Sequence, residues 1–311
     1  MYYVGVDVGG TTVKLGIFTF KGDLIDKWEI PTRKENSGEF ILGDIAKTVL
    51  AKLEELRISK KEVEGIGIGV PGPITEDGLV LKCANLGWGV FNVAEEVIRL
   101  TGINNVKVGN DANVAALGEM WKGGGEGFKS LVMITLGTGV GGGVILNGKI
   151  LTGSKGAAGE IGHLVIRLDE SDSCGCGKQG CLEQYASAKG IVKEAKRAFA
   201  RVTTPSPLRE LETLTAKDIF DYAKSGDQLA MELVDDLGRN LGLACSHIAQ
   251  ILDPEAFVIG GGVSKAGTIL LDVIKKNYND KVMFALKDKH FCLATLGNDA
   301  GIYGSARMVM E

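Results

Sequence analysis

Residues 4–14 read VGVDVGGTTVK, an apolar run that ends in a turn rich in glycine and threonine. Apolar runs over 13–20 and 24–30 follow, so the first 30 residues are predicted to form a three-stranded meander. A related stretch, ITLGTG, occupies 134–139. The recurrence after about 130 residues predicts a degenerate internal duplication, in which each half carries a strand that runs into a glycine turn.

Between and after these two stretches, apolar periodicity alternates between strand and helix. The first half is predicted to hold helices at 40–56, 93–100 and 110–121 and strands at 66–70 and 106–108. The second half is predicted to hold strands at 131–136, 140–146, 256–259 and 291–295, helices near 183–200, 215–224 and 227–251, and a final helix. Asn147 and Gly148 predict a type I′ hairpin turn. The alternation predicts an α/β fold.

Glycines at 123–125 interrupt the pattern between the halves. We therefore expect a smaller lobe at 1–122, onto which a helix at about 299–311 packs back, and a larger lobe at 123–298.

Composition disfavours several function classes. The 311 residues are 45% hydrophobic and 24% charged, with a net charge of -4, so no basic excess marks a nucleic-acid or membrane binder. No apolar run approaches the ~18 residues of a membrane span, and Asp7 stands where a signal peptide would be hydrophobic. We expect a cytoplasmic enzyme. Glycine is the outlier: it makes up 45 of the 311 residues, about twice its usual share of about 7%. This excess indicates tight turns and close backbone approaches.

Two glycine turns are candidate phosphate sites. The first, from Asp7 to Lys14, can aim backbone N–H groups and hydroxyls at a phosphate, and Asp7 can hold Mg²⁺ through water. The second is Gly137-Thr138-Gly139. Either turn alone could be a plain hairpin, but two of them favour a nucleotide clamped from both sides.

Two stretches, GIGVPG at 67–72 and GTGVGG at 137–142, satisfy the dinucleotide-binding pattern G-x-G-x-x-G. That pattern requires a helix directly after the turn. A predicted strand follows the second stretch and Pro73 follows the first, so a nicotinamide cofactor is not expected.

Cysteine spacing gives the most specific local signal. Three thiols and one imidazole make a tetrahedral zinc set. The alternatives are a disulfide, which a chain without a secretory signal disfavours, or unbonded thiols. Four protein ligands leave no open position, so we expect structural zinc. The predicted ligands are His163, Cys174, Cys176 and Cys181.

Polar residues near this set are candidate sugar ligands. Carboxylates such as Glu160 and Glu183 accept hydrogen bonds from adjacent sugar hydroxyls, and a metal-bound His163 has a fixed tautomer. Solvated surface acids, or for Glu183 an early-helix acid, are the alternative. Asn110 and Asp111 precede a helix and are candidate N-caps, while Asp111 can also serve as a general base.

These motifs together resemble the ROK family of sugar kinases and repressors, most closely its bacterial glucokinase branch. The resemblance covers nearly the whole chain and rests on residues 7–12, 110–111, 136–143, 160–163 and 174–183. It implies the actin-like, ribonuclease H-like ATPase duplication, with two lobes around a central cleft. It also implies a homo-oligomer of two or four copies of the chain, with glucose and ATP as substrates.

The resemblance further implies residue roles. Asp111 is expected to be the general base toward the sugar 6-hydroxyl, in a kinase that transfers the γ-phosphoryl group of ATP to glucose. The expected sugar ligands are Gly72, Asn110, Asp111, Glu160, His163 and Glu183. The expected ATP and Mg²⁺ residues are Asp7, Gly9, Gly10, Thr11, Thr12, Lys14, Gly137, Thr138, Gly261 and Gly262.

Three alternatives stay open at this point. The acceptor could be another hexose, namely fructose, mannose, allose or N-acetylglucosamine. A sugar-sensing repressor is disfavoured because only six residues precede Asp7, which leaves no room for a helix-turn-helix domain. An actin-like ATPase that moves partners would not need Glu160 and Glu183 beside a metal-held imidazole.

Overall fold

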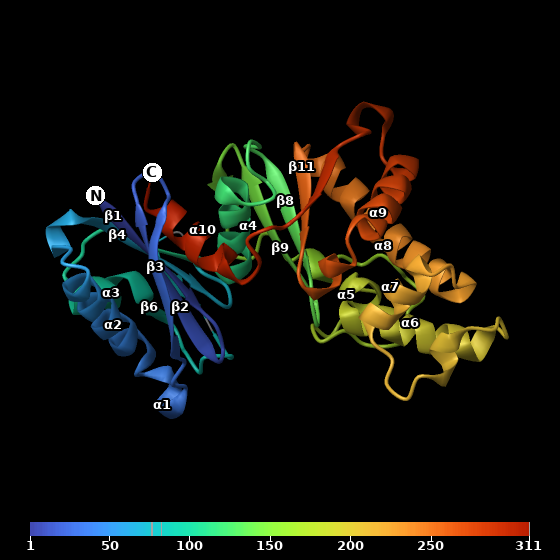
Figure 1. Ribbon diagram of the computed structural model, residues 1–311, viewed down its shortest axis with the longest axis horizontal. Helices are drawn as coiled ribbons and strands as arrows, with labels where there is room; N and C mark the ends of the chain where they lie inside the picture. Colours follow the sequence, from blue (N-terminus) through green and yellow to red (C-terminus); the bar gives the residue numbers. More distant parts are fainter. Residues whose placement is uncertain (76, 82, 311) are drawn as a thin grey trace. The chain divides into compact units, whose positions relative to one another are not determined.

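The computed structural model describes residues 1–75, 77–81 and 83–310, which form two compact α/β units (Figure 1). Unit 1 comprises Met1–Lys129, Gly143–Gly159 and Leu296–Glu311, and unit 2 comprises Ser130–Gly142 and Glu160–Thr295. The lobe boundaries given above, at residues 122 and 298, stay a prediction. Within the described residues, no helix combines the length and the apolar character that a membrane crossing requires.

Unit 1 is built on a five-stranded sheet in the order β3-β2-β1-β4-β7. The predicted meander is confirmed, since β2 pairs antiparallel with both β1 and β3, whereas β4 is parallel to β1 and β7 is parallel to β4. The strands are β1 (Tyr2–Val8), β2 (Thr12–Thr19), β3 (Leu24–Pro31), β4 (Val63–Val70) and β7 (Val106–Asn110).

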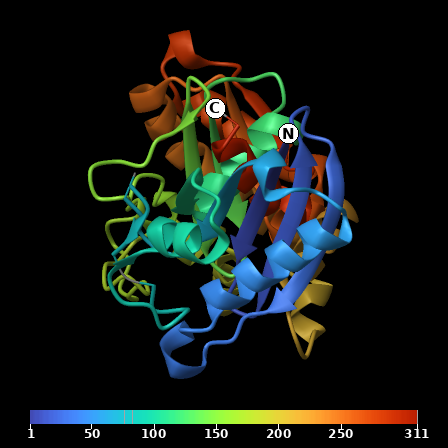
Figure 2. The ribbon, with the colours of Figure 1, turned by 90° about the vertical axis from the view of Figure 1, so that its left-hand side faces the viewer.

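Helices cover both faces of this sheet. The helices α2 (Ile41–Glu55) and α3 (Val93–Thr101) lie over one face, which is turned toward the viewer in Figure 2. Their apolar stripes and the strands share one core. The other face is covered by α4 (Asp111–Lys122) and the last helix, α10 (Ala300–Met308) (Figure 1).

Helix α10 approaches the strands closely because glycines face it. A Cβ on Gly5 would lie 2.0 Å from the Ile302 carbonyl oxygen, and one on Gly67 would lie 1.7 Å from that of Ser305. Ser305 Oγ donates a 2.7 Å hydrogen bond to the backbone oxygen of Val6. The first glycine of the GIGVPG stretch, Gly67, is therefore a packing residue.

A second five-stranded sheet has the order β10-β9-β8-β11-β12, which repeats the order of the first sheet strand for strand. The pairings β8–β11 and β11–β12 are parallel, and β9–β10 is antiparallel, as at the equivalent positions of the first sheet. The internal duplication predicted from the two glycine turns is thus confirmed. The strands are β8 (Leu131–Leu136), β9 (Val140–Leu146), β10 (Lys149–Ile150), β11 (Ala256–Gly260) and β12 (His290–Leu293).

The hairpin between β9 and β10 has positive φ at both central residues, 51° at Asn147 and 80° at Gly148, as a type I′ turn requires. The remaining helices of unit 2 are α5 (Glu183–Ala186), α6 (Ala188–Arg201), α7 (Ala216–Lys224), α8 (Gln228–Leu252) and α9 (Thr268–Lys281).

The predicted helix over 183–200 is two helices rather than one. Ser187 has an extended backbone, with ψ at 167°, and its Oγ accepts a 3.0 Å hydrogen bond from the Gly190 N–H. Ser187 is therefore the N-cap of α6, and it separates α6 from the single turn α5.

The shorter elements complete the chain. They are α1 (Glu35–Gly38), β5 (Leu79–Val80), β6 (Phe91–Asn92), and the 3₁₀ turns η1 (Lys60–Glu62), η2 (Ile161–His163), η3 (Pro207–Glu210), η4 (Gly262–Ala266), η5 (Phe284–Leu286) and η6 (Gly297–Asp299).

Candidate functional site

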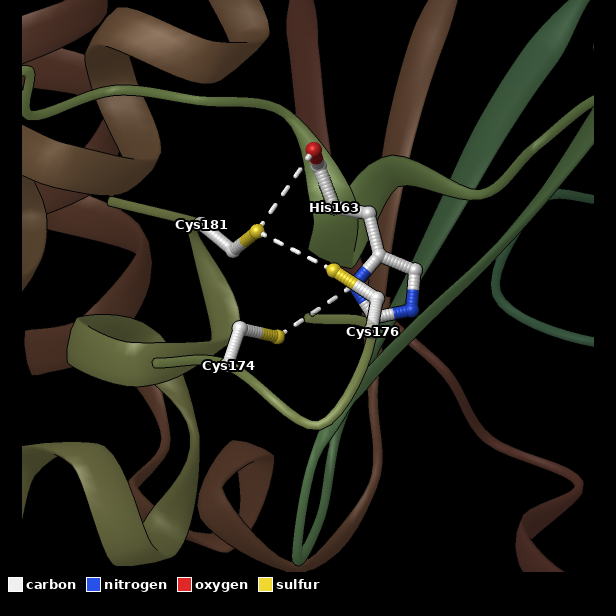
Figure 3. A group of neighbouring side chains, drawn as sticks. All are labelled: His163, Cys174, Cys176 and Cys181. Atoms are coloured by element: carbon white, nitrogen blue, oxygen red, sulfur yellow. Dashed lines mark hydrogen bonds between the residues drawn. The ribbon is translucent and has the colours of Figure 1, made fainter. Parts of the chain in front are cut away.

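Four potential metal ligands of unit 2 converge, as Figure 3 shows for His163, Cys174, Cys176 and Cys181, which we call the Cys–His cluster. Their ligand atoms all lie within 4.8 Å of one another. Cys176 Sγ is 3.6 Å from Cys181 Sγ, and Cys174 Sγ is 3.6 Å from His163 Nδ1. Tetrahedral zinc, with bonds of about 2.3 Å to sulfur and about 2.0 Å to nitrogen, requires separations of about 3.8 and 3.6 Å. The predicted ligands therefore fit a tetrahedral metal ion.

The loop that carries the cysteines is fixed by its own backbone. It runs over residues 164–182, and we call it the cysteine loop. Its two arms are joined where Ile166 N donates to Gly180 O at 2.8 Å and Leu182 N donates to Leu164 O at 2.8 Å. Gly180 has φ at 77°, and a Cβ there would lie 1.7 Å from the Arg167 oxygen, so the crossing of the arms requires glycine.

The three thiols of the Cys–His cluster are free, which rules out the disulfide alternative in this arrangement. Burial, reinforced by the carboxylate of Glu183, raises the pKa of Cys174 to about 12. The Cys174 thiol donates a 3.1 Å hydrogen bond to Glu183 Oε1. A metal ion that binds here must displace the thiol proton, because the thiolate is the ligand.

The three predicted sugar ligands of unit 2 lie at this cluster, and one of them, His163, belongs to it. His163 turns Nδ1 toward the cysteines, and its Nε2 lies 3.9 Å from Glu160 Oε2. Glu183 Oε1 lies 4.0 Å from the same imidazole, at Nδ1. The side chain of Glu160 is 65% exposed, which leaves its carboxylate open to a ligand. The structure therefore brings Glu160, His163 and Glu183 together, while their role toward a sugar stays a prediction.

The second glycine turn lies directly beside Glu183. A Cβ on Gly139 would lie 2.5 Å from Glu183 Oε2, and Gly137 O accepts a 2.8 Å hydrogen bond from Ala188 N. Thr138, at the tip, is exposed, and it lines a cavity of about 400 Å³ together with Glu183. Strand β9 follows this turn, as predicted.

A nucleoside-sized cavity, which the sequence did not predict, adjoins Gly262. It measures about 340 Å³, and Phe220 of α7 and Val263 of η4 contribute apolar side chains to it. Gly261 has φ at 83°, and a Cβ there would lie 2.5 Å from the Leu136 oxygen, so glycine is required beside the end of β8. Of the two predicted ATP residues here, Gly262 thus lines a cavity large enough for a nucleobase, and Gly261 directly precedes it.

In unit 1, the start of α4 holds the predicted base. Asn110 is the N-cap, since its Oδ1 accepts from Ala112 N at 3.0 Å and from Asn113 N at 3.2 Å. Its Nδ2 donates to Gly72 O at 3.1 Å, so Asn110 ties the predicted sugar residue Gly72 to the helix. Asp111 occupies the first helical position, half-buried, and accepts from Ala112 N at 2.8 Å. The N-cap role is thus filled by Asn110, and Asp111 is placed where the helix dipole stabilises its charge.

Asp7 lies at the end of β1, before the first glycine turn. Burial, with a further contribution from the charge of Asp111, raises the pKa of Asp7 from 3.8 to about 6, and Lys14 opposes this rise. Lys14 is its cross-strand partner, and Lys14 Nζ donates to Asn298 O at 3.0 Å. A carboxylate whose pKa is raised by a neighbouring acid favours binding of a cation beside it.

The first glycine turn itself is fixed from both sides. Gly9 N donates to Thr12 O at 3.0 Å, Thr32 Oγ1 donates to Gly9 O at 2.7 Å, and Thr32 N donates to Thr11 O at 2.9 Å. A Cβ on Gly10 would meet nothing within 4 Å, so the turn is open at its tip. Gly9, Gly10, Thr11 and Thr12 therefore present a pre-formed backbone turn, and phosphate binding by it stays a prediction.

Comparison with known proteins supports the same reading. The sequence matches the ROK family over residues 3–311. A glucokinase of Halalkalibacterium halodurans is 44% identical over 315 residues, which cover 100% of this chain and 95% of that protein. A glucokinase of Thermotoga maritima is 35% identical, with 99% and 97% covered.

The fold has solved counterparts as well. The crystal structure of a ROK family glucokinase from Streptomyces griseus, in complex with glucose and AMPPNP, matches with a TM-score of 0.73 and 34% identity, and 99% of each chain is covered. The predicted actin-like ATPase fold is confirmed by this likeness together with the repeated sheet order. This chain therefore belongs to the ROK family.

Proposed function

We propose that this chain is an ATP-dependent glucokinase that transfers the γ-phosphoryl group to the 6-hydroxyl of glucose. The observation that carries the proposal is the arrangement in unit 2, where Glu160, His163 and Glu183 lie together and Glu183 contacts the glycine turn at Gly139. Groups suited to sugar hydroxyls thus adjoin a turn suited to phosphate. The glucokinases that this chain resembles over their whole length support the same activity.

Sugar recognition follows from the chemistry of the side chains. A carboxylate accepts hydrogen bonds from two neighbouring hydroxyls, and Glu160 and Glu183 each offer one carboxylate on either side of His163. We propose that His163 Nε2 contacts a hydroxyl, because Nδ1 faces the cysteines. We further propose that zinc is the metal of the Cys–His cluster, where it would hold the cysteine loop in place. A site of this kind rejects analogues that lack one of the paired hydroxyls.

Proton removal is assigned to Asp111. Its position at the first turn of α4 keeps the carboxylate ionised, so it can accept the proton of the attacking hydroxyl. Asn110 fixes the helix start, and its bond to Gly72 orders the neighbouring turn. Phosphoryl transfer leaves the protein mainly to position and neutralise charge.

For ATP, we propose that the glycine turns at residues 9–12 and 137–139 bind the phosphates and that the cavity beside Gly262 holds the nucleobase. The apolar walls from Phe220 and Val263 suit a planar base. Bound Mg²⁺, held through water near Asp7, would neutralise the phosphates. Asp7 is suited to this because its carboxylate is buried near a second acid, Asp111, and a cation would offset the negative charge of both.

A coupled assay of ATP turnover with a panel of hexoses tests the function. We expect turnover with glucose that exceeds turnover with fructose, mannose, allose or N-acetylglucosamine, and we expect Asp111→Asn to abolish most of it. Preference for another hexose would reassign the acceptor within the family. Sugar binding without turnover in the unmodified chain would instead support a sensor. The cytoplasmic location is expected from the sequence composition, and the assembly of two or four copies is expected from the resemblance.

A further inference from the structure

An ionic cluster with a buried centre joins the cysteine loop to α6. No ligand of the Cys–His cluster takes part in it. Its centre is Glu170, whose side chain is 3% exposed. Arg197 of α6 donates to both oxygens of Glu170, at 2.7 Å each, and Tyr185 Oη donates to Glu170 at 2.6 Å. These charged hydrogen bonds hold the pKa of Glu170 far below its ordinary range. Glu170 is thus a fully partnered, ionised carboxylate.

Arg197 extends the cluster to other elements. Its guanidinium also donates to Glu194 at 2.9 Å and to Asp172 at 2.8 Å, which lies two residues before Cys174. Glu194 in turn accepts a 2.9 Å bond from Arg167, whose guanidinium lies 4.1 Å from the centre of the Tyr185 ring. One side chain, Arg197, therefore joins the outgoing arm of the cysteine loop to α6 through two carboxylates of the loop, Glu170 and Asp172, while Glu194 belongs to α6 itself.

The returning arm and α5 are tied to the same cluster. Tyr185, which is 1% exposed, belongs to the single turn α5 that Glu183 begins. Gln184 of the same turn donates to Asp172 O at 2.8 Å and accepts from Cys181 N at 3.0 Å. The position of Glu183 thus depends on Tyr185 and Gln184, and both reach back to the segment that Arg197 holds.

We propose that Arg197 is a positioning residue, which keeps the cysteine loop and α5 folded before any metal binds. It thereby sets the positions of the four proposed zinc ligands, among them His163, and of the sugar-binding candidate Glu183. The ionic cluster holds the loop at Glu170 and Asp172, and a bound metal would hold it at Cys174, Cys176 and Cys181. Partners that hydrogen-bond a metal ligand directly change metal affinity or activity by about 10–100-fold when they are removed. Arg197 acts one contact further out, through Asp172 and Gln184, so we expect an effect at the lower end of that range. The part of the inference that concerns glucose rests on the proposed function.

The experiment compares Arg197→Met with Arg201→Met, a matched control four residues further along α6 whose side chain is exposed. Hydrogen exchange of the amides at 171–183 is measured in the full-length, metal-stripped protein. Zinc affinity is measured by competition with a chromophoric chelator, and KM is measured separately for glucose and for ATP. We expect Arg197→Met to speed exchange in this segment, to weaken zinc binding by about 10-fold, and to raise KM for glucose while KM for ATP stays unchanged.

Two milder variants keep the test decisive if Arg197→Met does not fold. Tyr185→Phe loses one hydrogen bond to Glu170 and keeps the ring under Arg167, and Arg197→Lys keeps the charge but not the forked geometry. Both should speed exchange at 171–183, by less than Arg197→Met. Exchange and zinc affinity equal to those of the control would overturn the proposal, as would faster exchange spread evenly over unit 2. If the unmodified chain does not phosphorylate glucose, the proposed function fails, but the exchange measurement still decides the role of Arg197.

Discussion

Replacement of Asp7 by Asn should make the metal-free protein more stable and the enzyme less active. The wild-type carboxylate has a pKa raised from 3.8 to about 6, which means that folding favours its protonated form. The stability that this preference provides is fully present below pH 3.8 and is lost as the pH rises through 6. The full rise in the pKa corresponds to about 3 kcal/mol of folding free energy. Because the side chain of Asp7 is partly exposed to solvent, which screens its charge, we expect a change in stability of about 1–3 kcal/mol.

Asparagine does not ionise, so the variant avoids this loss. The free energy of unfolding of Asp7→Asn, relative to wild type, should therefore increase by about 1–3 kcal/mol between pH 4 and pH 7.5. All three tryptophans, Trp28, Trp88 and Trp121, belong to unit 1, so urea titrations followed by tryptophan fluorescence report on the unit that contains Asp7. Titrations are made without nucleotide or Mg²⁺, and Glu54→Gln, at an exposed acid of unit 1, is the control.

Activity should change in the opposite direction. The same variant lacks the charge that we assign to the Mg²⁺ site, so its kcat/KM for ATP should fall at every pH where the wild type is active. The quantity to compare is the free energy of unfolding of Asp7→Asn minus that of wild type. If this difference does not change with pH, or decreases as the pH rises, the account of Asp7 as a buried acid beside Asp111 is refuted. Unchanged kcat/KM for ATP would refute its assignment to the Mg²⁺ site.

Three further predictions follow from the other parts of the structure. Asp111→Ala should lower kcat by about 10²–10⁴-fold while calorimetry still detects glucose binding, and a near-normal kcat would exclude Asp111 as the base. Cys176→Ser should lower the zinc content and the Tm and raise KM for glucose. Cys292→Ser, a control outside the Cys–His cluster, should leave the zinc content unchanged. Full activity of a protein without zinc would contradict the structural role. Gly67→Ala should destabilise unit 1 by about 1–3 kcal/mol, because its Cβ would lie 1.7 Å from the Ser305 oxygen, and a tryptophan-detected unfolding curve equal to wild type would contradict this packing.

Local patterns predicted most of the fold. Apolar alternation predicted the meander at 2–30, and the two glycine turns predicted the duplication that the sheet orders confirm. The break at Ser187 was missed because apolar periodicity continues through it, and a serine inside a helix is common. Its N-cap role depends on the bond to Gly190, which a sequence pattern does not specify.

The Cys–His cluster could be predicted because its ligands are close in sequence and few chemical roles suit that spacing. The ionic cluster could not. Glu170 and Arg197 are 27 residues apart, and charged residues at such a distance are common in any soluble chain. The cavity beside Gly262 was missed for the same reason, since Phe220 and Val263 come from different elements and give no joint signal before the chain folds.

The order in which the units are completed during synthesis follows from the path of the chain. Unit 2 needs no residue beyond Thr295, whereas unit 1 lacks helix α10 until the last segment is available. The closely fitted surface at Gly5 and Gly67 has nothing to cover it before that moment. On the ribosome, the half of the protein that is translated first is therefore expected to finish folding last, and it leaves the exit tunnel with the part of its sheet that α10 covers still open to chaperones.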